Sequence, residues 1–385
     1  MQRRASPLEK KKMELYILVT HPPLPPPPIQ LTAIATMAAL FGWVWLGPWL
    51  TLGAAVGALH GHPGAALALA VILAAWAAPL KTDGSAAWPA FRDARIWDSW
   101  RRYFSLVIVT PGSEGRQGRG GGAPPPSAAA SSASPSGHAR PPTPSIDDLA
   151  PLAPGEPHLV VHFPHGTFPI GSFLSPRGAG VVGGLPPTTT VGAIASILFH
   201  LPLLRHVYAW CGCIPAGRAS IEGALRAGKA VGLVPEGVAG IFSRATRERE
   251  VVLSAHRGFV KLALRCCASA PAGDGHHHPT PIVPCFVFGQ SRVLSFAGSA
   301  RLSRTLRASV GVWWGRFGLP CLPRRVHLVV AAGRPVRLPR PAVPGAPTQA
   351  EIDAGWEAVL GELRRVYGAV RPGVRGYAGT RLEVK

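Results

Sequence analysis

Acidic residues are scarce in this chain of 385 residues. Asp and Glu together number 19 against 40 Lys and Arg, so the formal net charge is +21 at pH 7. Charged residues make up only 15% of the sequence, whereas ordinary soluble domains contain about 25%. The hydrophobic content of 47% excludes a wholly disordered chain, and the low charge argues against a freely soluble cytosolic enzyme. The basic excess favours a membrane surface or a polyphosphate-bearing substrate as partner.

Nucleic-acid-binding and metal-binding motifs are also missing. The sequence has no zinc finger, basic zipper or ribonucleoprotein strand motif, so no nucleic-acid partner is expected. Its six cysteines form no Cys-x-x-Cys pair, and the adjacent Cys266 and Cys267 argue against a secreted disulfide framework. The run His276-His277-His278 lies in a Gly/Pro-rich loop and is interpreted as low complexity. No metal or other cofactor is expected.

Several common catalytic motifs are absent. There is no Gly-x-Ser-x-Gly elbow, no P-loop, and no His followed by Asp at four or five residues. These absences argue against a common serine hydrolase, a P-loop nucleotidase and an acyltransferase with either of the usual His/Asp spacings.

A long uncharged stretch runs from Leu15 to Leu80. It contains two apolar segments, Leu31–Leu59 and Gly64–Leu80, separated by a turn-like His60–Gly64. Since a membrane-spanning helix needs about 20 apolar residues and both flanks are basic, the pattern predicts a helical hairpin with both ends in the cytosol. Insertion into one leaflet, or a pair of buried core helices, are the alternatives.

Composition divides the chain into segments. We expect a basic, Pro-rich disordered tail at 1–30, a transmembrane hairpin at 31–80 and an interfacial segment at 81–110. A disordered low-complexity insertion should follow at 111–156, and a catalytic domain at 157–385 with a loop insertion at 269–281.

The last of these segments has an α/β pattern. Apolar runs at Leu159–Phe163, Ala230–Val234, Ile282–Phe288 and Val326–Val330 are typical of buried strands. Helical patterns lie between them at Ser220–Ala227 and His256–Arg265. The alternation predicts an α/β fold with a largely parallel sheet. A capping box, Thr348 to Glu351, should open a further helix.

The sequence Pro164-His165-Gly166 follows the first of these strands directly. Catalytic groups of α/β sheets lie at strand ends, and a histidine there can act as a general base or can simply be structural. Glu236 also follows a strand, and its carboxylate could orient His165, bind an acceptor hydroxyl or be a solvated turn residue.

Several blocks together resemble the type 2 diacylglycerol acyltransferase family. They are Pro202–Arg205, Arg257–Leu264, Val283–Gly289, Trp314–Pro320 and the Pro-His-Gly turn. The resemblance covers roughly Leu31–Val109 and Pro157 to the end of the chain. It implies a membrane-bound enzyme that transfers a fatty acyl group from acyl-CoA to diacylglycerol, on an α/β domain of the glycerolipid-acyltransferase type that follows a membrane-embedded hairpin.

The resemblance also implies functional residues. His165 matches the family's catalytic histidine and Glu236 its motif glutamate, whereas Phe163 replaces the first histidine of the usual His-Pro-His-Gly turn. The substrate-binding residues expected from the matching blocks are Phe163, Pro164, Gly166, Arg257, Gly258, Phe259 and Arg316. Arg316 belongs to a run of nine arginines without an acid between Arg301 and Arg340, which suits phosphates of coenzyme A or lipid headgroups.

The acceptor and the membrane are less closely defined. Pro235-Glu236-Gly237 resembles a lysophosphatidate acyltransferase motif, which keeps a lysophospholipid as an alternative acceptor. Monoacylglycerol and a fatty alcohol are further alternatives, and Phe163 together with a missing motif glycine keeps open a scaffold that has lost activity. The resemblance implies the endoplasmic reticulum membrane with the active site facing the cytosol, and leaves the lipid droplet, the plastid envelope and an oligomer open.

Overall fold

The structure is a computed structural model that describes residues 27–110, 152, 155–175, 189–243, 245–254, 256–268, 278–306 and 309–385. Most of the expected tail, of the 111–156 insertion and of the 269–281 loop therefore lies outside the described residues.

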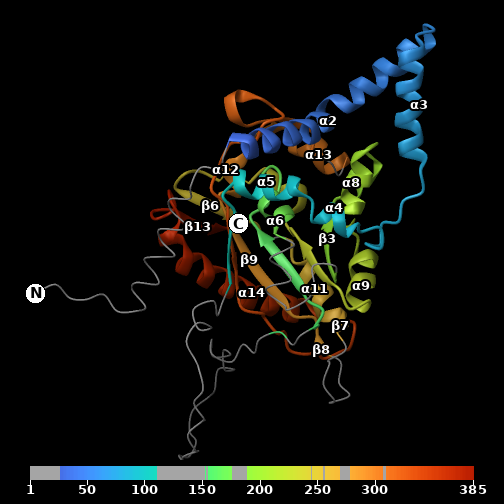
Figure 1. Cartoon of the computed structure of the whole chain (residues 1–385). Helices are drawn as coiled ribbons and strands as arrows, with labels where there is room; N and C mark the ends of the chain where they lie inside the picture. Colours follow the sequence, from blue (N-terminus) through green and yellow to red (C-terminus); the bar gives the residue numbers. More distant parts are fainter. Residues whose placement is uncertain are drawn as a thin grey trace, which may run out of the picture.

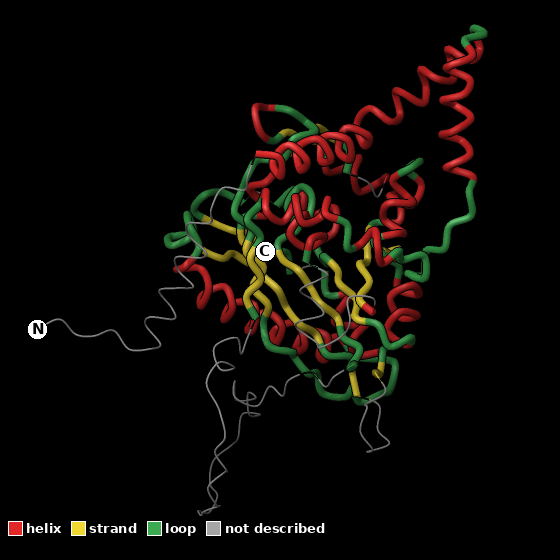
Figure 2. The backbone as a smooth tube through the Cα atoms, in the orientation of Figure 1, coloured by secondary structure: helices red, strands yellow, loops and turns green. Residues whose placement is uncertain are grey.

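A seven-stranded sheet forms the centre of the α/β part, with strand order β1-β12-β9-β2-β5-β3-β4. Five neighbouring strands, from β9 to β4, are parallel, while β12 runs antiparallel to β9 and parallel to β1. Figure 2 shows these strands as one twisted yellow layer. The strands are β1 (Val107–Val109), β2 (Leu159–Phe163), β3 (Thr190–Ile194), β4 (Cys213–Pro215), β5 (Ala230–Leu233), β9 (Ile282–Phe288) and β12 (Val329–Ala332).

The expected α/β fold class is confirmed. The expected strands Leu159–Phe163 and Ile282–Phe288 have the observed bounds. The strand expected at Ala230–Val234 ends one residue earlier, and the one expected at Val326–Val330 lies at Val329–Ala332. Three short strand pairs lie outside the main sheet. They are β10 (Ser295–Gly298) with β11 (Gly311–Trp314), β6 (Arg249–Val252) with β13 (Arg381–Val384), and β7 (Cys267–Ala268) with β8 (His278–Pro279).

One face of the sheet is covered by α9 (Arg218–Arg226), α11 (Gly258–Arg265) and α14 (Gln349–Val370). Their apolar residues pack with every second residue of the central strands, as the two-residue period of a strand requires. The expected capping box opens α14, because the Thr348 hydroxyl accepts from the Glu351 N–H and the Glu351 carboxylate accepts from the Thr348 N–H.

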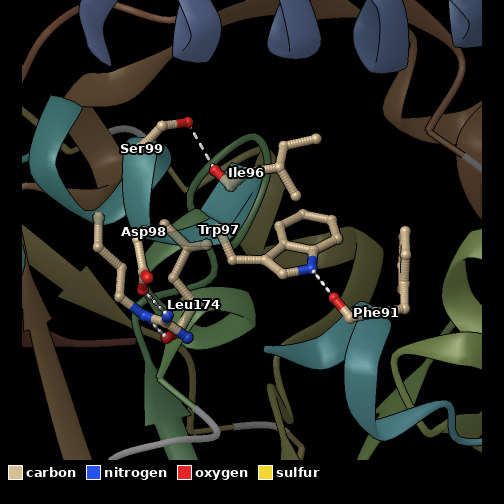
Figure 3. A network of polar contacts seen from close by, with 7 residues as sticks. Phe91, Ile96, Trp97, Asp98, Ser99 and Leu174 are labelled. Atoms are coloured by element: carbon tan, nitrogen blue, oxygen red, sulfur yellow. Dashed lines mark hydrogen bonds and ion pairs between the residues drawn. The ribbon is translucent and has the colours of Figure 1, made fainter. Parts of the chain in front are cut away.

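The opposite face is covered by α5 (Arg95–Tyr103), α6 (Ile170–Leu174) and the first half of α2 (Pro27–Leu59). Within this layer Arg101 of α5 pairs with Asp98 at 3.0 Å and donates from Nε to the Leu174 carbonyl at 3.1 Å. Figure 3 shows Asp98 of α5 close to Leu174 of α6. From α5, Trp100 Nε1 donates to Thr36 Oγ1 of α2 at 2.8 Å. These bonds join α2, α5 and α6 into one layer.

The remaining helices are short. They are α4 (Pro89–Arg92), η3 (Ser196–His200), α8 (Leu204–Trp210), α10 (Gly237–Ile241), α12 (Gln290–Val293), α13 (Ala300–Leu306), η4 (Arg316–Gly318) and η5 (Arg371–Gly373).

The two apolar helices meet at the expected turn. After Leu59 the chain reverses at residues 60–62, and α3 (Pro63–Ala77) runs back beside the end of α2, so this part of the pair stands away from the sheet (Figure 1). Among the described residues one segment, Pro27–Val44, is long and apolar enough to cross a membrane, while Leu46–Leu59 and Pro63–Ala77 are shorter apolar helices. The first half of α2 is thus partly a cover for the α/β domain, which agrees in part with the alternative of buried core helices.

Candidate active site

The Pro164-His165-Gly166 turn lies at the carboxyl end of β2, where parallel strands present functional groups. Gly166 has a φ of +64°, and a Cβ there would lie 2.9 Å from the Gln290 carbonyl oxygen. A side chain at this position would therefore meet fixed backbone. Gln290 is fully buried and stabilises the turn, because its Nε2 donates to the Pro164 carbonyl.

Glu236 supports the same turn from the end of β5. Its Oε2 accepts from the His165 backbone N–H at 2.6 Å, and its Oε1 accepts from the Leu253 N–H at 2.8 Å. The side chain is fully buried, and burial raises its pKa to about 7 against the opposing effect of these two N–H donors. The expected orienting role therefore takes a different form: Glu236 fixes the main chain of His165 instead of its imidazole, and it is not a solvated turn residue.

The imidazole of His165 has one ring nitrogen bonded to the main chain. Its Nδ1 lies 2.7 Å from the Gly166 carbonyl, which can only accept, so Nδ1 carries the proton and Nε2 keeps a lone pair. Burial lowers the pKa of His165 below its usual 6.5, although the hydrogen bond to Gly166 opposes this shift. The residue is therefore neutral at pH 7.

His165 lines a cavity of about 520 Å³ formed by described residues. This volume is in the range of small-molecule sites. Most of the wall is apolar, with charged side chains from Arg92, Asp93 and Arg101. Apolar lining residues come from α2, α6, β3 and the segment after β3, and include Phe41, Val44, Phe173, Ile194, Leu198 and Leu201. The cavity can hold an aliphatic chain with one end beside the His165 imidazole.

Strand alternation separates His162 from Phe163. His162 lines the cavity, and its Nε2 lies 3.2 Å from the Ser175 hydroxyl. Burial lowers the pKa of His162 to about 4, so it is neutral. Phe163 lies on the other face of the sheet with Phe259 and Trp356, whose ring centroids are 6.4 and 6.2 Å from its own. The histidine of this strand that faces the cavity is thus His162, one residue before the position that the family motif suggests.

The other expected substrate-binding residues are spread over the molecule. Arg257 forms an ion pair with Asp353 of α14 and donates from Nε to the Ser254 carbonyl at 3.2 Å, while Gly258 begins α11 on the same side. Arg316 lies in η4 with its guanidinium 4.7 Å from the centroid of the Phe317 ring. The structure brings Pro164, His165, Gly166 and Glu236 together. It does not bring Phe163, Arg257, Gly258, Phe259 or Arg316 into the cavity wall, and their contact with substrate stays a prediction.

Sequence reasoning missed Gln290 and Gly240. Gln290 follows the Val283–Gly289 block by one residue, and its Oε1 accepts from the Ser172 N–H at 3.3 Å. Gly240 of α10 packs directly against the turn, because a Cβ there would lie 2.6 Å from the Cβ of His165. Proximity to the matched block was the signal for Gln290, whereas nothing in the sequence marked Gly240.

Replacing Glu236 with glutamine is expected to lower turnover, although less than loss of His165. The amide keeps one oxygen for one backbone N–H but turns its NH₂ group toward the other, which leaves a buried donor unpaired at a cost of about 1–3 kcal/mol. Acyl-transfer rates and thermal unfolding would be compared with Glu357→Gln, at an exposed position on α14. Equal rates and unfolding temperatures for both variants would contradict the role of Glu236.

A neutral histidine at the end of a central strand, in the wall of an apolar cavity, is an arrangement suited to chemistry on lipids. Comparison of the sequence with known families gives a match to the diacylglycerol acyltransferase family over residues 146–371. The match covers more than half of the chain, and the protein belongs to this family.

Individual relatives are distant. Diacylglycerol O-acyltransferase 1 of Eremothecium gossypii is 24% identical over 60% of this chain and 51% of its own length. The 2-acylglycerol O-acyltransferase 3 of Homo sapiens is 26% identical over 53% of this chain and 61% of its own. The acyl-CoA wax alcohol acyltransferase 1 of Mus musculus is 27% identical over 37% and 41%. The chain thus spans about half the length of the curated relatives it matches. No solved structure gives a significant match.

Proposed function

We propose that the protein transfers a fatty acyl group from acyl-CoA to diacylglycerol and forms triacylglycerol. The observation that carries this proposal is the free Nε2 of His165 at an apolar cavity in a chain of the diacylglycerol acyltransferase family. A neutral imidazole beside a lipid-sized cavity is what deprotonation of a lipid hydroxyl requires.

His165 acts as general base in this mechanism. An alcohol is about as weak an acid as water, with a pKa of ~15.7, so its proton leaves only as the oxygen attacks the thioester carbon. Nε2 takes that proton while the C–O bond forms. Backbone N–H groups after Gly166 stabilise the oxyanion. The C–S bond then breaks, and coenzyme A leaves as a thiolate that recovers the proton from the imidazolium. No acyl-enzyme is needed.

The acceptor is tested directly with full-length protein in microsomes. Labelled acyl-CoA is supplied with diacylglycerol, monoacylglycerol, a fatty alcohol or lysophosphatidate, and the products are separated. We expect triacylglycerol to form fastest. Preferred acylation of another acceptor would replace diacylglycerol as substrate, and no acylation of any acceptor would support a scaffold.

The membrane is proposed to hold the projecting ends of the two apolar helices. Leu46–Leu59 and Pro63–Ala77 expose large apolar side chains to solvent, among them Trp49 at 69% and Leu59 at 86%. At 1.5 Å per residue each segment is about 21–23 Å long, less than the ~30 Å hydrocarbon core. Both helices therefore enter from the cytosolic side of the endoplasmic reticulum and turn back inside the bilayer, which places the catalytic domain where acyl-CoA is found.

This topology predicts that protease added to sealed microsomes removes tags from both ends of the chain. A glycosylation acceptor inserted at residues 60–62 should stay unmodified, because the turn does not reach the lumen. A C-terminal tag that is protected until detergent is added would contradict the hairpin. Glycosylation at the turn would show a pair that crosses the whole bilayer.

A further inference from the structure

The segment from Arg316 to Pro320 forms an exposed apolar tip that the proposed mechanism does not use. Phe317 is 78% exposed and Leu319 is 46% exposed, and Val312 on the neighbouring strand β11 is 52% exposed. Single exposed apolar residues are normal on protein surfaces, but here three lie within eight residues of the chain, and we call these three residues the apolar patch.

The backbone holds this patch in a fixed, outward conformation. Phe317 has φ 57° and ψ 20°, a left-handed conformation that a phenylalanine adopts at a cost, and Gly318 follows with φ +74°. The turn is closed by backbone bonds from Gly315 N–H to the Leu319 carbonyl at 2.9 Å and from Arg316 N–H to the Leu322 carbonyl at 2.7 Å. The ring is thus presented to solvent by a hydrogen-bonded turn.

The tip lies on the same side of the molecule as α2. Trp313 and Cys321, which flank it in the sequence, pack against the cluster that contains Met37 and Phe41 of α2. The orange segment around α13 stands beside α2 in Figure 1. Further along, α2 leads into the exposed apolar segment Leu46–Leu59. The tip therefore neighbours the helix that is proposed to enter lipid.

Charge at the tip suits a lipid headgroup layer. The Arg316 guanidinium lies 4.7 Å from the centroid of the Phe317 ring, and no acid occurs between Arg301 and Arg340. An aromatic ring with an adjacent arginine is the composition found at lipid–water interfaces, because the ring enters the boundary while the cation stays among phosphates.

We propose that the Arg316–Pro320 tip inserts Phe317 into the lipid–water interface and gives the catalytic domain its own contact with the membrane, separate from α2 and α3. This inference rests on the membrane attachment proposed above. The partner is the phospholipid surface, since the patch continues the side of the molecule from which the apolar helices project and its charge is opposite to that of anionic headgroups.

Site-specific photocrosslinking tests the proposal on the full chain. Benzoylphenylalanine is placed singly at Phe317, Leu319, Leu52 or Val343, and the protein is reconstituted in phosphatidylcholine–phosphatidylserine nanodiscs that carry an alkyne-tagged phospholipid. Leu52 is 55% exposed on α2 and reports the helical hairpin. Val343 is 57% exposed and adjoins the start of α14, away from α2, because the N–H of the neighbouring Ala342 donates to the Glu351 carboxylate.

We expect lipid adducts at 317, 319 and 52 that exceed the adduct at 343 by at least tenfold. Adducts at 52 alone would overturn the second contact and leave the hairpin intact. Adducts at none of the four sites would overturn membrane attachment as well. Loss of the adduct at 317 on addition of acyl-CoA, with the adduct at 52 unchanged, would also overturn the proposal, because the tip would then bind coenzyme A.

Discussion

Replacing His165 with alanine should lower the rate of acyl transfer by roughly 10²–10⁴-fold, the usual contribution of a general base. The variant removes the imidazole and retains the backbone N–H that Glu236 holds. Protein level and membrane association should therefore stay near those of the parent. The rate is measured with labelled acyl-CoA and diacylglycerol in microsomes, with the exposed His200→Ala as the matched control.

The pH dependence gives a second readout of the same residue. Because burial lowers the pKa of His165, more than half of this histidine is neutral at pH 6.5, where an ordinary histidine is half protonated. We expect the wild-type rate to fall in two steps as the pH is lowered from 8: a first near pH 7, where Glu236 with its pKa of about 7 takes up a proton, and a second below pH 6.5, where His165 is protonated. In the first of these two experiments, a His165→Ala variant that keeps more than a tenth of the parental rate would remove His165 from the role of general base.

Adding one methyl group at Gly240 should also lower the activity strongly. A Cβ there would lie 2.6 Å from the Cβ of His165 and 2.7 Å from that of Glu236, so the turn and the carboxylate that holds it would have to separate. Displacements of about 1 Å can cost ~10²-fold in rate, and we expect Gly240→Ala to lose at least tenfold in activity per molecule of membrane-bound protein.

A matched glycine serves as the control for this variant. Gly223 lies within α9, and a Cβ at that position would meet no atom within 4 Å. Gly223→Ala should therefore keep full activity and gain slightly in stability, since alanine favours helix over glycine. Equal activities of the two variants would show that α10 does not set the position of the catalytic turn.

The sequence predicted the framework of this site well because local signals coincide there. In two places a buried apolar run is followed within three residues by a functional candidate: β2 by His165 and β5 by Glu236. The two strands are parallel neighbours, so the structure places both residues at the carboxyl end of the sheet. The strands β3 and β4 escaped prediction. Thr190–Ile194 contains a glycine and only partly buried residues at its end, and Cys213–Pro215 is three residues long, so neither shows the pattern of a buried strand.

Other features depend on contacts between distant segments. Glu236 acts through a backbone N–H of His165, which no spacing of residues indicates. The cavity is built from α2, α6 and β3, and the first half of α2 has the composition of a membrane helix although it covers the domain. Composition reports that a helix is apolar, but it does not report whether lipid or protein packs against it.

The packing of Phe163 has a consequence for exchanging parts between relatives. Phe163, Phe259 and Trp356 touch one another in the core, with centroid distances of 6.1 to 6.4 Å, so the size of each side chain limits the other two. Substitutions among residues in such contact are not additive. A chimera that imports the His-Pro-His-Gly turn alone would place a polar ring among these aromatics, and it should become stable only when positions 259 and 356 are exchanged with it.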